Sequence, residues 1–442
     1  MKRTTLSILI GLLYIISVDA QSLDTLKLDG FFNALEVNDR YMGSFAMSHE
    51  GEIIYSKAIG HENSAAQKKS SEETKYRVGS ITKMFTSALI FMAVEENKLK
   101  LDQTLDTYFL KIKNAEKITV SHLLNHRSGI LNFTSVDDYL KWNTQKKTRE
   151  ELLNIIIESP SVFEPDSKAE YSNSNYVLLT FILEEVFGKP YAELVKTRIA
   201  QPLELTHTKV GSKIDSTNHE AHSYVYSHTN SWKKQPETHM SIPLGAGAII
   251  STPTDLTKFV EGLFAEKLIS AESLEQMKTI KDNYGMGIFQ MPFYGKKGFG
   301  HNGGIDGFSS VLGVIPEDDL AFALTTNGSR YSNNDILIAA LSAFYGKPFE
   351  IPTFSNIEVT SEELDTYLGI YASEQIPLKI TITKKGNVLI GQATGQPSFN
   401  LEATEKDVFE FAQAGVRLEF NPKENTMVLK QGGGEYKYTK EY

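Results

Sequence analysis

Residues 76–94 read YRVGSITKMFTSALIFMAV, in which Ser80 and Lys83 stand three positions apart at the head of an apolar run. The run predicts a buried helix that Ser80 opens. Residues three apart share a helix face, so the amino group of Lys83 can lie beside the hydroxyl group of Ser80. A serine becomes a good nucleophile when a neighbour takes its proton, which lysine can do only where burial or nearby charge favours its neutral form. The stretch therefore predicts a serine nucleophile with a lysine partner.

The S-x-x-K tetrad is weak evidence by itself, because the chain contains a second one. Residues 231–234 read SWKK and lie in a polar stretch without an apolar helical face. Judged alone, Ser80 in such a tetrad is more often a helix N-cap and Lys83 a solvated side chain. The motifs that follow in the chain must therefore show whether Ser80 and Lys83 have a catalytic or a structural role.

Two later motifs give the first tetrad a chemical context. Tyr171-Ser172-Asn173 follows it, and His301-Asn302-Gly303-Gly304 comes afterwards, just before a strand pattern that begins at Phe308. A tyrosine phenol near a lysine can relay protons to a leaving group, and an asparagine amide can hold a substrate amide. A glycine-rich strand edge presents backbone N–H groups to an oxyanion. The set predicts acyl transfer through serine.

With these motifs the sequence resembles the serine β-lactamase and penicillin-binding superfamily, specifically its branch similar to class C β-lactamases and D-alanyl-D-alanine carboxypeptidases. The resemblance covers roughly residues 30–345. The stretches that carry it are, in order, YRVGSITK (76–83), LLNHRSG (123–129), YSN with Tyr176 (171–173), Pro202-Leu203, STPTDL (251–256) and GHNGG (300–304).

The resemblance implies an α+β fold, in which an antiparallel sheet flanked by helices stands beside a mostly helical lobe. A connector rich in proline and serine follows Gly346, and only short alternating strand patterns lie beyond it. We therefore expect a signal peptide at 1–20, a β-lactamase-like hydrolase domain at 21–350 and a small C-terminal antiparallel β domain at 351–442, similar to the small barrels of some peptidase relatives.

The resemblance also implies roles for individual residues. Ser80 would be the nucleophile, Lys83 and Tyr171 the proton-transfer pair, and Asn173 an anchor for substrate and lysine. The strand with His301, Gly303 and Gly304 would bind substrate, and the backbone N–H groups of Ser80 and Gly304 would form the oxyanion hole. His301 would stand where relatives often have lysine. Since an unperturbed histidine has a pKa of roughly 6.5, its attraction for a substrate carboxylate should fade through neutral pH.

Three departures from the family pattern stand out. His301-Asn302-Gly303 replaces the Lys-Thr-Gly usual in β-lactamases, which argues against efficient β-lactam turnover. Asp166 stands where a glycine is usual and puts the shape of its loop in question. Tyr331-Ser332-Asn333 duplicates the tyrosine motif, but it follows the histidine motif, so Tyr171 is the preferred candidate.

Other candidate patterns have simpler explanations. Glu150 fits an E-x-x-L-N deacylation motif but sits in a helix capped by Thr148, so we assign it to the helix surface. His122 and His126 have the spacing of helical metal ligands, yet no carboxylate completes a set, and we expect structural roles. The histidine-rich, aromatic stretch 219–239 is most simply a loop near the site entrance. We expect no metal and no cofactor.

Composition sets the outer limits of the function. The chain has 442 residues, no cysteine and a formal net charge of -10, and no long basic run is present, so nucleic acid is not an expected partner. Lys2 and Arg3 precede an apolar run that ends before Ala20, which predicts signal cleavage there and an exported protein, periplasmic or extracellular. That run is short for a membrane span, which needs roughly 20 residues.

We interpret the sequence as an exported serine hydrolase that acylates on Ser80. The resemblance favours a D-alanyl carboxypeptidase or D-amino-acid peptidase acting on a small molecule or peptide, such as a cell-wall peptide. The alternatives are an esterase or weak β-lactamase, or a sensor or binding protein that acylates without turnover.

Overall fold

The computed structural model describes residues 23–227, 231–354, 357 and 359–441. The predicted signal peptide lies outside these residues. In the described part of the chain, no helix is long and apolar enough to cross a membrane.

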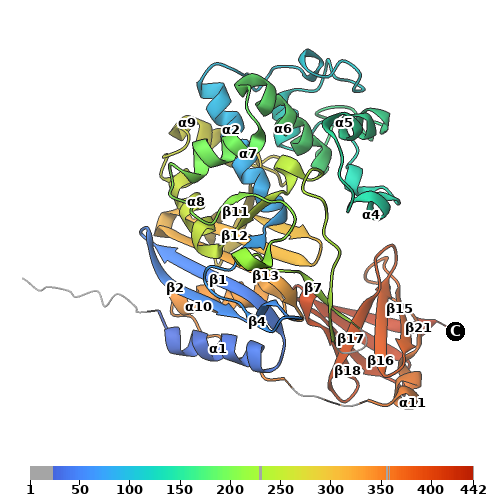
Figure 1. Cartoon of the computed structure of the whole chain (residues 1–442). Helices are drawn as coiled ribbons and strands as arrows, with labels where there is room; N and C mark the ends of the chain where they lie inside the picture. The colour runs from blue at the N-terminus through green and yellow to red at the C-terminus, as the bar shows by residue number, and fades with distance from the viewer. Residues whose placement is uncertain (1–22, 228–230, 355–356, 358, 442) are drawn as a thin grey trace, which may run out of the picture.

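A six-stranded antiparallel sheet forms the centre of the larger domain, in the order β10-β11-β12-β13-β1-β2 (Figure 1). Side chains on its strands alternate between two cores, because successive strand residues point to opposite faces. Val311 and Ile315 pack with α1 (Thr25–Val37) and α10 (Asn333–Phe344). Leu312 and Val314 face the core built around α2 (Thr82–Glu95) and α8 (Pro253–Phe264). The strands are β1 (Tyr41–His49), β2 (Glu52–Ile59), β10 (Phe289–Phe293), β11 (Lys296–Ile305), β12 (Phe308–Ile315) and β13 (Leu320–Ser329).

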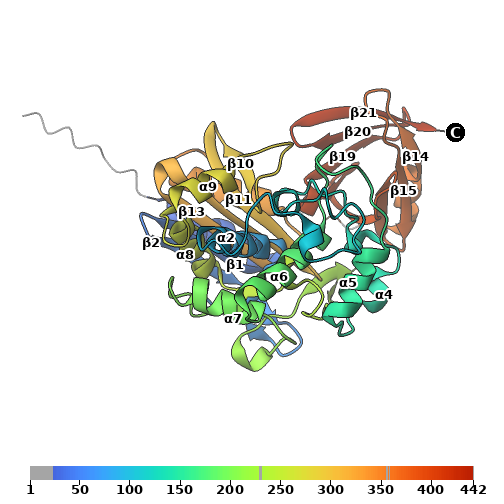
Figure 2. The same cartoon turned by 90° about the horizontal axis from the view of Figure 1, so that it is seen from above.

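Helices on one side of the sheet make a lobe around α2 (Thr82–Glu95) (Figure 1), and α2 lies among these helices in the view from above (Figure 2). Helix α2 is buried along most of its length. The capping box predicted at Thr148 is confirmed at the start of α5, and Glu150 lies exposed on that helix. The remaining helices are α1 (Thr25–Val37), α3 (Val120–Leu124), α4 (Tyr139–Trp142), α5 (Arg149–Glu158), α6 (Asn173–Phe187), α7 (Tyr191–Val195), α8 (Pro253–Phe264), α9 (Ala271–Lys278), α10 (Asn333–Phe344) and α11 (Ser361–Leu364).

Three small sheets connect these parts. They comprise β3 (His61–Asn63) with β4 (Lys68–Lys69), β5 (Tyr76–Arg77) with β9 (Ile249–Ser251) and β6 (Lys209–Val210), and β7 (Tyr224–Ser227) with β8 (Ser231–Lys234). The expectation of a simple loop over 219–239 is wrong for β7 and β8, which pair as a hairpin. The second S-x-x-K tetrad forms β8, so the side chains of Ser231 and Lys234 do not share a helical face.

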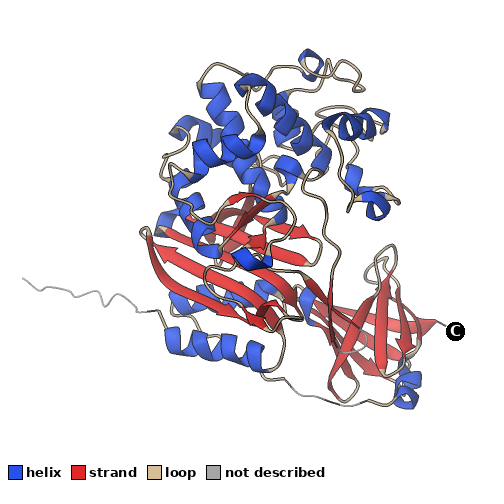
Figure 3. Ribbon diagram, viewed as in Figure 1, coloured by secondary structure: helices blue, strands red, loops and turns tan. Residues whose placement is uncertain are grey.

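The C-terminal part is a closed antiparallel barrel with its own apolar core (Figure 3). Glu402 of the barrel forms ion pairs with Arg40 and Arg330 of the larger domain. This arrangement and the sheet with its helical lobe confirm the predicted α+β class. The barrel strands are β14 (Gly369–Ala372), β15 (Ile380–Lys385), β16 (Val388–Ala393), β17 (Phe399–Glu405), β18 (Val408–Phe411), β19 (Val416–Asn421), β20 (Thr426–Gln431) and β21 (Gly434–Glu441).

Candidate active site

Ser80 sits in a tight turn between β5 and α2. The turn is a 3-10 helix over Gly79–Ile81, and α2 begins only at Thr82, so Ser80 precedes the α-helix it was predicted to open. Gly79 has a φ of 50°, and a side chain there would come within 2.7 Å of the backbone nitrogen of Gly304. Glycine therefore permits both the left-handed backbone and the close approach of β11 to the turn.

Lys83 is fully buried beside Ser80. Its Nζ lies 3.1 Å from Oγ of Ser80, 2.8 Å from Oδ1 of Asn173 and 2.8 Å from the carbonyl oxygen of Ala246. Burial lowers the pKa of the Lys83 ammonium group well below its ordinary value, because a charged group loses solvation in the interior. The structure thus favours the neutral amine that a proton acceptor requires.

Tyr171 approaches the same serine from just before α6. Its hydroxyl group donates a 2.7 Å hydrogen bond to Oγ of Ser80, and its ring packs on His126 at a centroid distance of 4.5 Å. Burial raises the pKa of the Tyr171 phenol, so the protonated form is favoured. Ser80 is therefore flanked by one group held as a base and another held as an acid.

Asn173 begins α6 and fixes the lysine. Its Oδ1 accepts the hydrogen bond from Lys83, and its Nδ2 donates to Oδ1 of Asn132 at 3.2 Å and to Oγ1 of Thr134 at 3.1 Å. The side-chain amide thus has protein partners at both its oxygen and its nitrogen. Asn173 therefore makes the contact with Lys83 that was expected of it, and the contact expected with substrate stays a prediction.

The strand with His301, Gly303 and Gly304 lies along the serine turn. Strand β10 pairs with β11 only as far as Gly300, so beyond that point the side of β11 away from β12 is open to the turn. A side chain at Gly303 would collide with the carbonyl oxygen of Val78, two residues before Ser80. The backbone of β11 at Gly303 and Gly304 therefore lies directly against the turn that holds Ser80.

His301 does not have the ordinary pKa that the sequence prediction assumed. Its ring is 2% exposed and packs on Phe289, and Nδ1 donates to the carbonyl oxygen of Asn302 at 2.5 Å. Burial lowers the pKa of His301 to about 3, because a charged imidazolium loses solvation in the interior. The expected titration through neutral pH is therefore wrong, since the imidazole is uncharged throughout that range.

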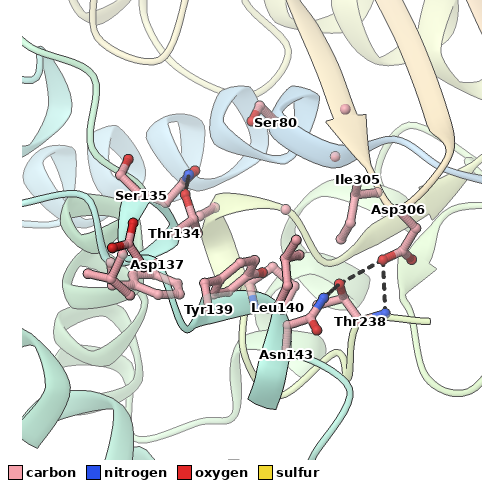
Figure 4. A pocket seen from close by; sticks show the side chains of 18 residues that line it. Ser80, Thr134, Ser135, Asp137, Tyr139, Leu140, Asn143, Thr238, Ile305 and Asp306 are labelled. Atoms are coloured by element: carbon pink, nitrogen blue, oxygen red, sulfur yellow. Dashed lines mark hydrogen bonds between the residues drawn. The ribbon is translucent and has the colours of Figure 1, made fainter. Parts of the chain in front are cut away.

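A cleft of about 580 Å³ opens in front of Ser80 (Figure 4). Its wall includes Phe133, Tyr139 and Leu140 from the segment around α4, and Ile305 and Asp306 from the end of β11. The 18 lining residues, all within the described part of the chain, include the carboxylates Asp137 and Asp306 but no lysine, arginine or histidine.

The other singled-out residues lie around the site or away from it. His126 is buried behind Tyr171, where its Nδ1 accepts a hydrogen bond from the backbone N–H of Ser172. No group of metal-ligating side chains is present among the described residues.

Asp166 has a φ of 63°, so it adopts the left-handed conformation of the glycine it replaces, and its carboxylate pairs with Arg127. Tyr331 packs on Phe31 and Phe354, in the core on the opposite face of the sheet.

Sequence reasoning missed Asn132, Thr134 and Ala246. Asn132 caps the 3-10 turn Phe133–Ser135, and an Asn followed two positions later by Thr is a local turn signal. Nothing in that signal indicates a link to Asn173. Ala246 contributes only a backbone carbonyl group, which leaves no mark on the sequence.

Comparisons with known proteins show what the chain is similar to. A family model described as Beta-lactamase matches residues 36–344. Penicillin-binding protein 4* of Bacillus subtilis is 23% identical over 92% of this chain and 97% of its own length. Teichoic acid D-alanine hydrolase of Staphylococcus aureus is 27% identical over 68% of this chain and 73% of its own length.

Two solved structures extend the comparison. The octameric penicillin-binding protein homologue from Pyrococcus abyssi has a TM-score of 0.66 and 26% identity, covering 94% of this chain and 99% of its own. A D-stereospecific amidohydrolase from Streptomyces sp. has a TM-score of 0.63 and 27% identity, covering 72% of this chain and 99% of its own. The first of these spans the barrel as well as the larger domain.

Proposed function

Because this chain belongs to the beta-lactamase family, we propose that it is an exported serine hydrolase that forms an acyl-enzyme on Ser80 and cleaves esters or amides of D-amino acids. The observation that carries the proposal is that a buried basic group and a buried acidic group both contact the hydroxyl group of Ser80. Oγ of Ser80 lies 2.7 Å from the Tyr171 hydroxyl and 3.1 Å from Nζ of a fully buried Lys83.

The hydrogen bonds of Lys83 fit a general base. A neutral amine has two N–H donors and one lone pair. Oδ1 of Asn173 and the carbonyl oxygen of Ala246 accept the two donors, which leaves the lone pair for the proton of Ser80. As Lys83 takes that proton, Oγ bonds to the substrate carbonyl carbon, and the N–H groups of Ser80 and Gly304 stabilise the oxyanion.

Tyr171 serves the second half of acylation. The leaving atom departs from the carbon now bonded to Oγ, within reach of the phenol, which gives it a proton. The proton held by Lys83 then restores the phenol. Water attacks the acyl-enzyme by the reverse sequence of transfers, releasing the acid and the free serine. Asn173 keeps Lys83 in place throughout.

The cleft supports an ester or amide substrate over a free C-terminal carboxylate. A carboxypeptidase must hold that carboxylate, and a buried carboxylate needs a cation or several donors. With a pKa lowered to about 3, His301 is uncharged at neutral pH, and none of the described residues that line the cleft is basic. Relatives described as a teichoic acid D-alanine hydrolase and a D-stereospecific amidohydrolase support a D-amino acid as the acyl group.

A matched pair of substrates tests this choice. A peptide ending in D-Ala-D-Ala and the same peptide with a C-terminal amide differ only in the terminal charge. We expect the amide to be cleaved at least as fast as the acid, and a D-alanine nitrophenyl ester faster than its L-enantiomer. Cleavage of the acid alone would instead establish a carboxypeptidase, and an acylation burst without turnover would establish a sensor.

A further inference from the structure

A buried ion pair joins the two backbone segments that supply the oxyanion hole. Arg77, three residues before Ser80, donates from Nη1 to Oδ2 of Asp306 at 2.8 Å, and Asp306 stands two residues after Gly304. Both side chains are 2% exposed. An arginine and an aspartate so deeply buried persist only when they are paired and hydrogen-bonded.

The remaining bonds of the pair tie it to the cleft wall. Oδ1 of Asp306 accepts from the backbone N–H of Thr238 at 2.9 Å and from its hydroxyl at 2.7 Å, and Asn143 donates to that hydroxyl at 3.0 Å (Figure 4). Arg77 also donates to the carbonyl oxygens of Thr238 and Ser212, and its Nη2 forms a longer ion pair of 3.3 Å with the more exposed Glu237. Asp306 is held with a φ of 56°, so the turn after Gly304 is fixed both in its backbone and by its side chain.

We propose that Arg77 and Asp306 are positioning residues that set the separation of the Ser80 and Gly304 N–H groups. This inference rests on the proposed acyl-enzyme function. The two segments touch directly at Gly79 and Gly304, but that contact is between backbones without side chains and limits only how close they come. The ion pair limits how far apart the two segments move, because Arg77 lies beside the contact on one segment and Asp306 beside it on the other.

The proposal predicts a loss of kcat without a matching change in substrate binding or in the pH dependence of acylation. A shift of about 1 Å in a donor can cost on the order of 100-fold in rate, and one oxyanion donor contributes about 100- to 1,000-fold to kcat. Loss of the pair should therefore lower kcat while KM and the pH midpoint of acylation stay nearly constant, because Lys83 has no contact with either residue.

The test compares Asp306→Asn with Glu62→Gln. Glu62 is equally buried, forms an ion pair with Lys68 and accepts a hydrogen bond from Thr74, and none of these three residues belongs to the Gly79–Ile81 turn or to β11. We expect both variants to lower Tm, but only Asp306→Asn to lower kcat for a D-alanine ester and the rate of fluorophosphonate labelling, by about 10- to 100-fold with KM within about twofold.

Arg77→Lys supplies an independent variant, because it keeps the charge but cannot span Asp306 and both carbonyl groups at once. It should show the same selective loss of kcat if Asp306→Asn fails to fold. Wild-type kcat in either folded variant, or an equal loss of kcat in Glu62→Gln at matched Tm, would overturn the positioning role. Failure of the unmodified protein to label at Ser80 would instead overturn the proposed function.

Discussion

The Tyr171 hydroxyl lies 2.7 Å from Oγ of Ser80 and donates to it, although the two residues are 91 positions apart in the chain. Oγ of Ser80 also faces Lys83. Burial lowers the pKa of the Lys83 ammonium group and raises the pKa of the Tyr171 phenol. One desolvated environment thus prepares both an uncharged base and an uncharged acid, since burial disfavours whichever form is charged.

Removal of the Tyr171 hydroxyl should impair turnover. We expect Tyr171→Phe to lower kcat by about 100- to 10,000-fold, the range typical of lost acid–base assistance. Tyr331→Phe is the matched control, because that ring packs on Phe31 and Phe354 across the sheet from Ser80. Steady-state kinetics with an ester substrate measures both, and the opposite ranking would identify Tyr331 as the functional tyrosine.

Acylation should depend on neutral Lys83. Because its pKa is lowered from 10.5, the acylation rate should rise with pH and reach its plateau well below pH 10.5. Lys83→Ala should lower that plateau by about 100- to 10,000-fold. Lys75→Ala is the control, since Lys75 is also buried but bonds to the carbonyl oxygen of Asn218. A rate that keeps rising to pH 10.5 would contradict the lowered pKa.

The preference between charged and neutral substrates should not change with pH as a result of His301 titration. With its pKa lowered to about 3, the imidazole gains no charge between about pH 5.5 and 8. The ratio of kcat/KM for a carboxylate-bearing D-peptide to that for a neutral ester should change by less than about twofold. A tenfold fall across this range that His301→Gln removes would show that the imidazole is accessible and titrates.

The motifs predicted which side chains meet at Ser80, because their spacing is local or their order along the chain is informative. Ser80 and Lys83 are one helical turn apart, and Tyr171-Ser172-Asn173 opens a helix that carries Asn173 to the lysine. The burial of His301 was not predictable, since its shell comes from Phe289 on a neighbouring strand and from the site itself. Likewise, Arg77 and Asp306 are 229 positions apart in the sequence, so no local pattern indicates their contact.

The connector between the two domains belongs in part to the larger one. Phe349 is 9% exposed and packs on Phe31 of α1, so a chain that ends near Gly346 loses a core aromatic residue. We expect a chain ending after Phe354 to unfold cooperatively, and one ending at Gly346 to lose about 3 kcal/mol relative to it. Urea unfolding measures the difference, and equal midpoints would show that residues 347–354, with Phe349 among them, contribute little.

The central claim is that Ser80 alone becomes acylated. Labelling the whole protein with a fluorophosphonate, followed by intact mass and peptide mapping, tests it most directly. We predict one equivalent of label on Ser80, none in Ser80→Ala, and unchanged labelling in Ser231→Ala. Label that persists in Ser80→Ala, or that maps to Ser231, would contradict the account.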